Sequence, residues 1–146
     1  MGKTSTKEYL GTILSSKYKT IRTEASKNSL IGIAELLLAQ LIPSHEAFVV
    51  EMGAYMKGEI AEMCEMVEPE IAIVTAINPQ HQDLFGSIEN TIEAKYELIS
   101  GLTGKKIVVI NADNAYTMRM GQRATHEGYT VITYSTVQKI ADWYAT

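Results

Sequence analysis

Short β-rich runs alternate with helical patterns along the whole chain, and this alternation constrains the fold more than any other feature of the sequence. The segments Ile71–Ile77 and Lys106–Asn111 each contain an uninterrupted apolar stretch, which is typical of parallel strands buried on both faces. The pattern predicts right-handed strand-helix-strand crossovers, and therefore an α/β fold whose mostly parallel sheet has helices on both faces. No linker, repeat or shift in composition divides the sequence, so we expect no internal domain boundary within residues 1–146.

The expected elements follow from these patterns. The expected strands are Thr20–Thr23, Ala47–Met52, Ile71–Ile77, Lys106–Asn111 and Thr130–Tyr134. The expected helices are Thr4–Ser16, Ser29–Ile42, Lys57–Val67, Ser87–Gly101, Asn114–His126 and Thr136–Tyr144.

Composition excludes several classes of function. The single cysteine, Cys64, rules out an internal disulfide framework, a CxxC redox pair and a multi-cysteine metal site, and it favours a reducing, cytoplasmic setting. The 13 basic and 17 acidic residues give a net charge of −4 with no basic face, which argues against nucleic-acid binding. The most apolar window, Ser29–Ile42, is shorter than the roughly 20 residues that span a bilayer, so we expect no membrane insertion.

The chain starts with a candidate phosphate-binding segment. Gly2, Lys3 and Thr4 match the end of a phosphate-binding loop, in which glycine allows close approach of the backbone, lysine reaches the terminal phosphates and the threonine hydroxyl ligates Mg²⁺. The same residues also fit an ordinary helix N-terminus capped by Thr4 or Thr6. The helix that follows carries apolar residues at the spacing of one face packed on a sheet, namely Tyr9, Leu10, Ile13 and Leu14.

Two polar residues follow expected strands, at the sheet edge where ligands bind in open α/β folds. Glu51 ends an apolar strand, where a carboxylate can hold Mg²⁺ beside phosphates, although a solvated glutamate fits the same position. His81 lies in a polar loop between a strand and a helix, as a metal or phosphate ligand or simply as a hydrogen-bonded loop residue. The segment 111–114 (Asn-Ala-Asp-Asn) either forms a turn and helix cap or contacts a nucleotide.

Lys95 occupies an unusual position for a lysine. It falls on the same helical stripe as Ile88, Ile92 and Ile99, so its ammonium group must snorkel to water, find a partner or lose its charge. The functional alternative is a lysine that is chemically modified or serves as a ligand.

Taken together, these segments resemble the Mur ligase family, the ATP-dependent enzymes that add amino acids to the peptidoglycan precursor. The residues of these segments are most similar to those of the branch that adds D-alanyl-D-alanine. The matching segments are Gly2–Glu8, Thr23–Gly32 with Asn28, Val49–Gly53, Ile73–His81, Phe85–Ser87, Ala94–Glu97 and Asn111–Asp113.

The resemblance implies a P-loop NTPase-like central domain with ATP and Mg²⁺ as cofactors. It implies γ-phosphoryl transfer from ATP to a carboxylate of a UDP-muramoyl peptide, giving an acyl phosphate that the amine of D-alanyl-D-alanine attacks. For the nucleotide, the resemblance implies phosphate binding by Gly2, Lys3, Thr4 and Ser5 and further contacts by Asn111 and Asp113. For the metals, it implies one Mg²⁺ at Thr4 and Glu51 and a second Mg²⁺ at His81 and a carbamylated Lys95. It also implies that Lys3, His81 and Lys95 take part in catalysis and that Asn28 contacts the substrate.

The sequence also departs from the family pattern. Thr75-Ala76-Ile77 stands where many relatives have Thr-Asn-Ile, and the first half of the phosphate-binding loop is missing. We therefore expect a central domain truncated at both ends, without the N-terminal UDP-substrate domain and the C-terminal domain. We expect this chain to be inactive alone. We also expect it to self-associate through an exposed sheet edge. Three alternatives stay open: a non-catalytic module, a folylpolyglutamate or cyanophycin synthetase-like ligase, and a generic flavodoxin-like or Rossmann-like domain, although no G-x-G-x-x-G supports the last.

Overall fold

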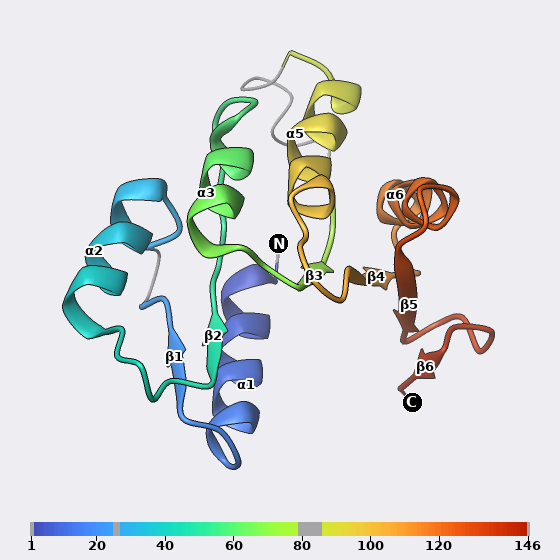
Figure 1. Ribbon diagram of the computed structural model, residues 1–146. Helices are drawn as coiled ribbons and strands as arrows, with labels where there is room; N and C mark the ends of the chain where they lie inside the picture. Colours follow the sequence, from blue (N-terminus) through green and yellow to red (C-terminus); the bar gives the residue numbers. More distant parts are fainter. Residues whose placement is uncertain (1, 25–26, 79–85, 146) are drawn as a thin grey trace. The chain divides into compact units, whose positions relative to one another are not determined.

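A computed structural model of the chain describes residues 2–24, 27–78 and 86–145 (Figure 1). The chain forms two compact units, Gly2–Ala54 and Tyr55–Thr146. The described strands form a two-stranded sheet, β1-β2, and a four-stranded sheet, β3-β4-β5-β6, and every pairing within them is parallel. The predicted α/β class with parallel strands is confirmed.

The unit Gly2–Ala54 is built around one parallel strand pair. Ile21 lies opposite Phe48 in the register, and α1 packs along both strands (Figure 1). Ser29 caps the second helix, because its hydroxyl accepts a hydrogen bond from the Gly32 N–H at 3.3 Å. The elements of this unit are α1 (Lys3–Ser15), β1 (Thr20–Arg22), α2 (Leu30–Gln40) and β2 (Ala47–Val49).

Helix α1 buries a face that matches the predicted one only in part, since Leu10 and Leu14 are partly buried. Tyr9 and Ile13 remain 73% and 67% exposed, whereas Lys7 and Gly11, four residues apart, are the buried positions of the helix. Arg22 explains the glycine, because a Cβ atom at Gly11 would lie only 2.6 Å from the Arg22 Cδ. The helix therefore packs on the strand pair with a lysine and a glycine in the contact.

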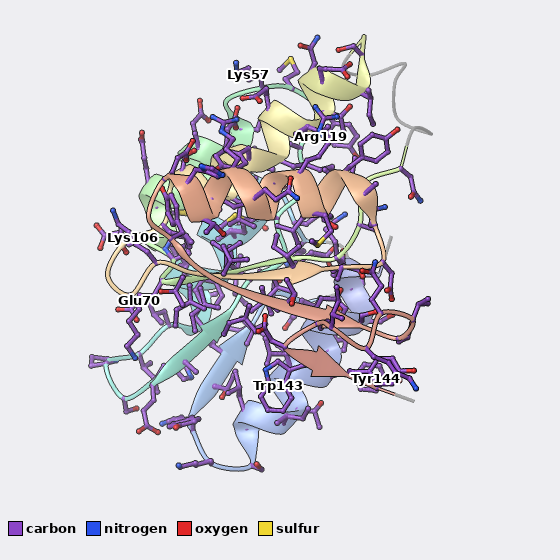
Figure 2. All side chains as sticks on the ribbon, turned by 90° about the vertical axis from the view of Figure 1, so that its right-hand side faces the viewer. Lys57, Glu70, Lys106, Arg119, Trp143 and Tyr144 are labelled. Atoms are coloured by element: carbon purple, nitrogen blue, oxygen red, sulfur yellow. The ribbon has the colours of Figure 1, made fainter. Side chains whose placement is uncertain are left out.

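The unit Tyr55–Thr146 is a parallel sheet with helices packed on it. Helix α6 packs on β4 and β5, and α5 packs against both α3 and α6. The core contains Val108, Ile110 and Met120, all fully buried. Figure 2 shows α6 along one face of the sheet and labels Trp143 and Tyr144 on the short outer strand β6. The elements of this unit are α3 (Glu59–Val67), β3 (Ile71–Val74), α5 (Ile88–Ser100), β4 (Ile107–Asn111), α6 (Ala115–His126), β5 (Thr130–Ser135) and β6 (Trp143–Tyr144).

The predicted helix Thr136–Tyr144 is wrong. The segment after β5 forms bends and a turn and then returns as β6, which pairs in parallel with the end of β5. Asp142 accepts hydrogen bonds from the backbone N–H and the hydroxyl of Thr133, both at 2.7 Å. This contact fixes the returning chain beside β5, which a continuous helix would not allow. In the described part of the chain, no helix is long and apolar enough to cross a membrane.

Candidate functional site

The first turn of α1 offers backbone N–H groups to an anion. Gly2 precedes the helix with φ of 82°, in the left-handed region that glycine adopts without strain. Lys3, Thr4 and Ser5 follow as exposed residues of the first turn. The predicted alternative of a cap at Thr4 or Thr6 is wrong, because both residues lie inside α1 and no side chain among the described residues caps it. A helix N-terminus of this kind binds phosphate through its N–H groups and its dipole.

Glu51 lies just beyond β2 and is held in place at several points. Only 6% of the residue is exposed, and its backbone N–H donates to the hydroxyl of the fully buried Thr23 at 3.0 Å. The side-chain amide of Asn28 donates to Glu51 Oε1 at 3.3 Å. Asn28 is itself fixed against Gly53, whose N–H donates to the Asn28 carbonyl at 2.8 Å and where a Cβ would lie 2.9 Å from Asn28 Cγ. Asn28 therefore orients the Glu51 carboxylate in this structure.

The second carboxylate oxygen, Glu51 Oε2, is buried without a hydrogen-bond partner among the described residues. The Lys7 ammonium lies 3.9 Å from it. Because Lys7 follows Lys3 by four residues and Thr4 by three, all three side chains share one face of α1. The candidate phosphate-binding turn and the Glu51 carboxylate thus belong to the same end of this unit.

The donor set around Glu51 fits a magnesium ion. Mg²⁺ prefers oxygen ligands, and proteins usually hold it with one or two carboxylates while phosphate oxygens and waters complete its shell. A buried carboxylate oxygen with no hydrogen bond among the described residues meets this need, and Thr4, on the face of α1 that carries Lys7, has a hydroxyl oxygen of the same donor type. In residues 2–24, 27–78 and 86–145, no three histidine, cysteine or acidic side chains cluster as a self-sufficient metal site. An ion here would therefore depend on phosphate and water ligands as well.

Two asparagines hold the loops at the carboxyl ends of β3 and β4. Asn111 donates from its side-chain amide to the carbonyl of Thr75 at 2.8 Å, and Asn114 donates to the carbonyl of Ile77 at 3.0 Å. The Asn114 side-chain oxygen also caps α6, where it accepts from the Thr117 N–H at 3.1 Å. The segment that leaves β3 is thereby tied to the start of α6. His81 lies within residues 79–85, outside the described residues.

Asp113 holds the turn that follows β5. Its carboxylate accepts hydrogen bonds from the Ser135 hydroxyl, from the Thr136 N–H at 2.9 Å and from the Thr136 hydroxyl at 3.0 Å. The bond from Ser135, followed by that from the Thr136 N–H, keeps the pKa of Asp113 below its usual value of 3.8. These contacts also hold residues 135–136 at the point where the sequence pattern predicts a helix start.

Lys95 lies half-buried on α5, within the predicted stripe. Ile92 and Ile99 of that stripe are buried and Ile88 is partly buried, so the predicted spacing of the stripe is confirmed. Lys95, Asn111 and Asp113 belong to the unit Tyr55–Thr146. The unit Gly2–Ala54 contains the other predicted residues, namely those at the start of α1, Asn28 and Glu51.

Two further residues of these units were not predicted from the sequence. Glu97, two positions after Lys95, accepts hydrogen bonds from the N–H groups of Gly58 at 2.8 Å and Ala61 at 3.2 Å, at the start of α3. Lys7 is the other, and its four-residue spacing to Gly11 is the only sign of its burial in the sequence. The sequence gives a weaker sign of the role of Glu97: the residue before α3 is Gly58, which has no side chain to cap the helix, so the first N–H groups of the helix need another acceptor.

Comparison with protein families gives one match that extends over the whole chain. The family described as "Mur ligase middle domain" matches residues 1–146. Among curated proteins, the UDP-N-acetylmuramoyl-tripeptide--D-alanyl-D-alanine ligase of Escherichia coli (strain K12) is 40% identical over 113 residues, which are 77% of this chain and 25% of that protein. The enzyme of the same name from Synechocystis sp. is 35% identical over 123 residues, which are 84% of this chain and 27% of that protein.

Solved structures agree with the sequence matches. A crystal structure of MurF from Acinetobacter baumannii superposes with a TM-score of 0.88 at 28% identity, over 100% of this chain and 31% of that one. The MurF ligase of Thermotoga maritima, solved in complex with ADP, gives a TM-score of 0.78 at 25% identity, over 94% of this chain and 31% of that one. The chain thus spans about a quarter of the curated relatives it matches and about a third of these solved chains.

Proposed function

Because the chain belongs to the Mur ligase middle-domain family, we propose that it is the ATP-binding part of a ligase that adds D-alanyl-D-alanine to a UDP-muramoyl peptide. The names of the curated relatives support the choice of dipeptide. One observation within the chain carries the proposal: the buried Glu51 carboxylate has an oxygen without a hydrogen bond among the described residues, and Lys7 joins it to the helix that starts with Gly2, Lys3 and Thr4. ATP and a UDP-linked substrate would place the reaction in the cytoplasm.

In this proposal the unit Gly2–Ala54 binds the phosphates. The N–H groups at the start of α1, including that of Ser5, would bind the β- and γ-phosphate oxygens, with the Lys3 ammonium beside them. The Thr4 hydroxyl and Glu51 Oε2 would hold Mg²⁺, and Asn28 and Thr23 would keep the carboxylate in place. When bound, Mg²⁺ would neutralise negative charge on the phosphoryl group that is transferred.

The unit Tyr55–Thr146 would supply the remaining groups. Asn111 and Asp113 would act at the nucleotide edge through the loops that they hold together. Lys95 would be carbamylated: its amine, after losing the ammonium proton, would add to CO₂ and lose a second proton, giving a carbamate. The carbamate would be an oxygen ligand suited to a second Mg²⁺, with His81 as its partner ligand. Glu97 would fix α5, and with it Lys95, by binding the first turn of α3.

The proposed reaction has two steps. A carboxylate oxygen of the UDP-muramoyl peptide attacks the γ-phosphorus of ATP, and the bond to the leaving ADP oxygen breaks, giving an acyl phosphate. The amine of D-alanyl-D-alanine then attacks the acyl carbon, phosphate leaves, and the amine proton is lost as the amide forms. The contribution of the protein is positioning and neutralisation of charge rather than covalent chemistry.

Nucleotide affinity tests this assignment on the full-length protein that contains the chain. Calorimetric titration with ADP, in the presence of Mg²⁺ and then of EDTA, measures how far the metal contributes to binding. We expect Glu51→Gln to abolish the metal-dependent gain in affinity, which should be at least tenfold in the unsubstituted protein. The matched control is Glu35→Gln, because Glu35 is an exposed glutamate on α2. An equal metal-dependent gain in Glu51→Gln and the unsubstituted protein would contradict the magnesium assignment.

A further inference from the structure

Lys7 is a buried cation that the proposed reaction leaves without a role. Only 3% of the residue is exposed, although it lies just one turn inside α1. A buried ammonium is costly unless carboxylates balance its charge. Two carboxylates do so: Glu8 Oε1 at 3.1 Å and Glu51 Oε2 at 3.9 Å. Arg22 completes the set, with its Nε 3.2 Å from Glu8 Oε2, so that charges of opposite sign alternate from Glu51 to β1.

The two distances from Lys7 differ in their chemical meaning. At 3.1 Å the Lys7–Glu8 pair is within hydrogen-bonding distance, whereas 3.9 Å to Glu51 is beyond it. Lys7 thus gives Glu51 a neighbouring positive charge without occupying a lone pair of Oε2. Asn28 takes the other oxygen, Oε1. The result is a carboxylate that is fixed and balanced in charge, yet keeps one oxygen available to a metal ion.

We propose that Lys7 is a positioning residue, the resident counter-charge of Glu51, which holds this carboxylate ready for a divalent cation and limits how tightly the cation binds. The proposal rests on the assignment of Glu51 to Mg²⁺ made above. A divalent ion at Oε2 would lie within a few ångströms of the Lys7 ammonium, and like charges at that separation repel strongly where water is excluded. Lys7 therefore keeps the affinity for the free metal low, so that the metal binds well only when phosphate oxygens accompany it.

Direct metal binding without nucleotide tests this role. The probe is Mn²⁺, whose free concentration is read from its electron paramagnetic resonance signal during titration of the full-length protein at fixed pH and salt. We expect Lys7→Met, which keeps most of the length of the side chain and removes the charge, to bind Mn²⁺ about tenfold more tightly than the unsubstituted protein.

Three further variants provide the controls. Lys7→Arg retains the charge and should bind Mn²⁺ no more tightly than the unsubstituted protein, which separates charge from packing. Lys17→Met removes an exposed lysine of the same unit and should stay within about twofold of the unsubstituted protein. If Lys7→Met does not fold, as judged by circular dichroism, Lys7→Gln carries the same expectation, because it is also neutral.

Glu51→Gln separates the failure of this proposal from the failure of the proposed function. If Glu51→Gln loses Mn²⁺ binding while the neutral Lys7 variants bind no more tightly, the role of Lys7 is refuted and the metal assignment stands. If Glu51→Gln binds Mn²⁺ as well as the unsubstituted protein does, the metal assignment and the Lys7 proposal fail together. Tighter binding by the neutral variants, lost when Glu51→Gln is added, is the result we expect.

Discussion

Thr23→Val tests whether the position of Glu51 depends on one buried hydroxyl. Thr23 is fully buried, and its Oγ1 accepts the backbone N–H of Glu51 at 3.0 Å. Valine has nearly the same shape but no acceptor, so the substitution leaves a buried N–H without a partner. Such a group costs about 1–3 kcal/mol, and we take about 2 kcal/mol as the expected loss of unfolding free energy. For a chain of this size, that loss lowers the melting temperature by roughly 4–8 °C.

The matched control is Thr23→Ser, which keeps the hydroxyl and removes one buried methyl group, at a cost of about 1 kcal/mol. The two variants separate clearly in amide hydrogen exchange at Glu51. Thr23→Val should lose protection at that single amide, whereas Thr23→Ser should retain it. The proposed role of the Thr23 hydroxyl is refuted if Thr23→Val keeps the protection of the Glu51 amide and melts within about 1 °C of the unsubstituted protein.

Three further predictions concern the unit Tyr55–Thr146. Asn114→Ala should lower the unfolding free energy by about 2 kcal/mol, because it removes a helix cap and the hydrogen bond to Ile77, each worth about 1 kcal/mol. A loss below about 0.5 kcal/mol, measured by urea unfolding, would contradict this prediction. Glu97→Ala should speed hydrogen exchange of the first amides of α3 and leave those of α6 unchanged; equal rates in α3 before and after substitution would count against the contact. The folded pKa of Asp113 lies below its unfolded value, chiefly because of Ser135, so this group stabilises the fold above about pH 4 and the stabilisation is lost as the pH falls through the folded pKa. Melting curves from pH 2 to 6 should therefore show a weaker acid dependence for Asp113→Asn, and an unchanged dependence would exclude this role.

The regular elements could be predicted because their signals are local. The apolar runs of β3 and β4, and the helical spacing of Ile88, Ile92 and Ile99 on α5, can be read within a short window of sequence. The failed helix at Thr136–Tyr144 had a local signal as well. The conformation of this segment depends instead on two carboxylates that hold it in place. Asp113, distant in sequence, binds Thr136, and Asp142 binds Thr133 across the turn, and no local pattern contains these contacts.

The candidate site was only partly predictable for the same reason. Glu51 could be found because it ends an apolar run, and Lys3 because of the residues beside it. Lys7 could not, since a lysine one turn into a helix is usually solvated and its spacing to Gly11 is too weak a sign without the packing of α1 on β1. The bond from Asn28 to Glu51 joins residues 23 positions apart, a contact that depends on the folded strand pair.

The most direct test of the proposed ligase function is to identify the acceptor that the full-length protein uses. The assay incubates the protein with ATP, Mg²⁺, UDP-muramoyl-tripeptide and one amine at a time, and follows ADP release and the mass of the UDP-linked product. We expect ADP release to depend on D-alanyl-D-alanine and the product to gain the mass of that dipeptide less one water. ADP release that requires a folate with glutamate, as for a folylpolyglutamate synthetase, or a cyanophycin primer with aspartate or arginine, as for a cyanophycin synthetase, with no dipeptide product from UDP-muramoyl-tripeptide, would contradict the proposed function.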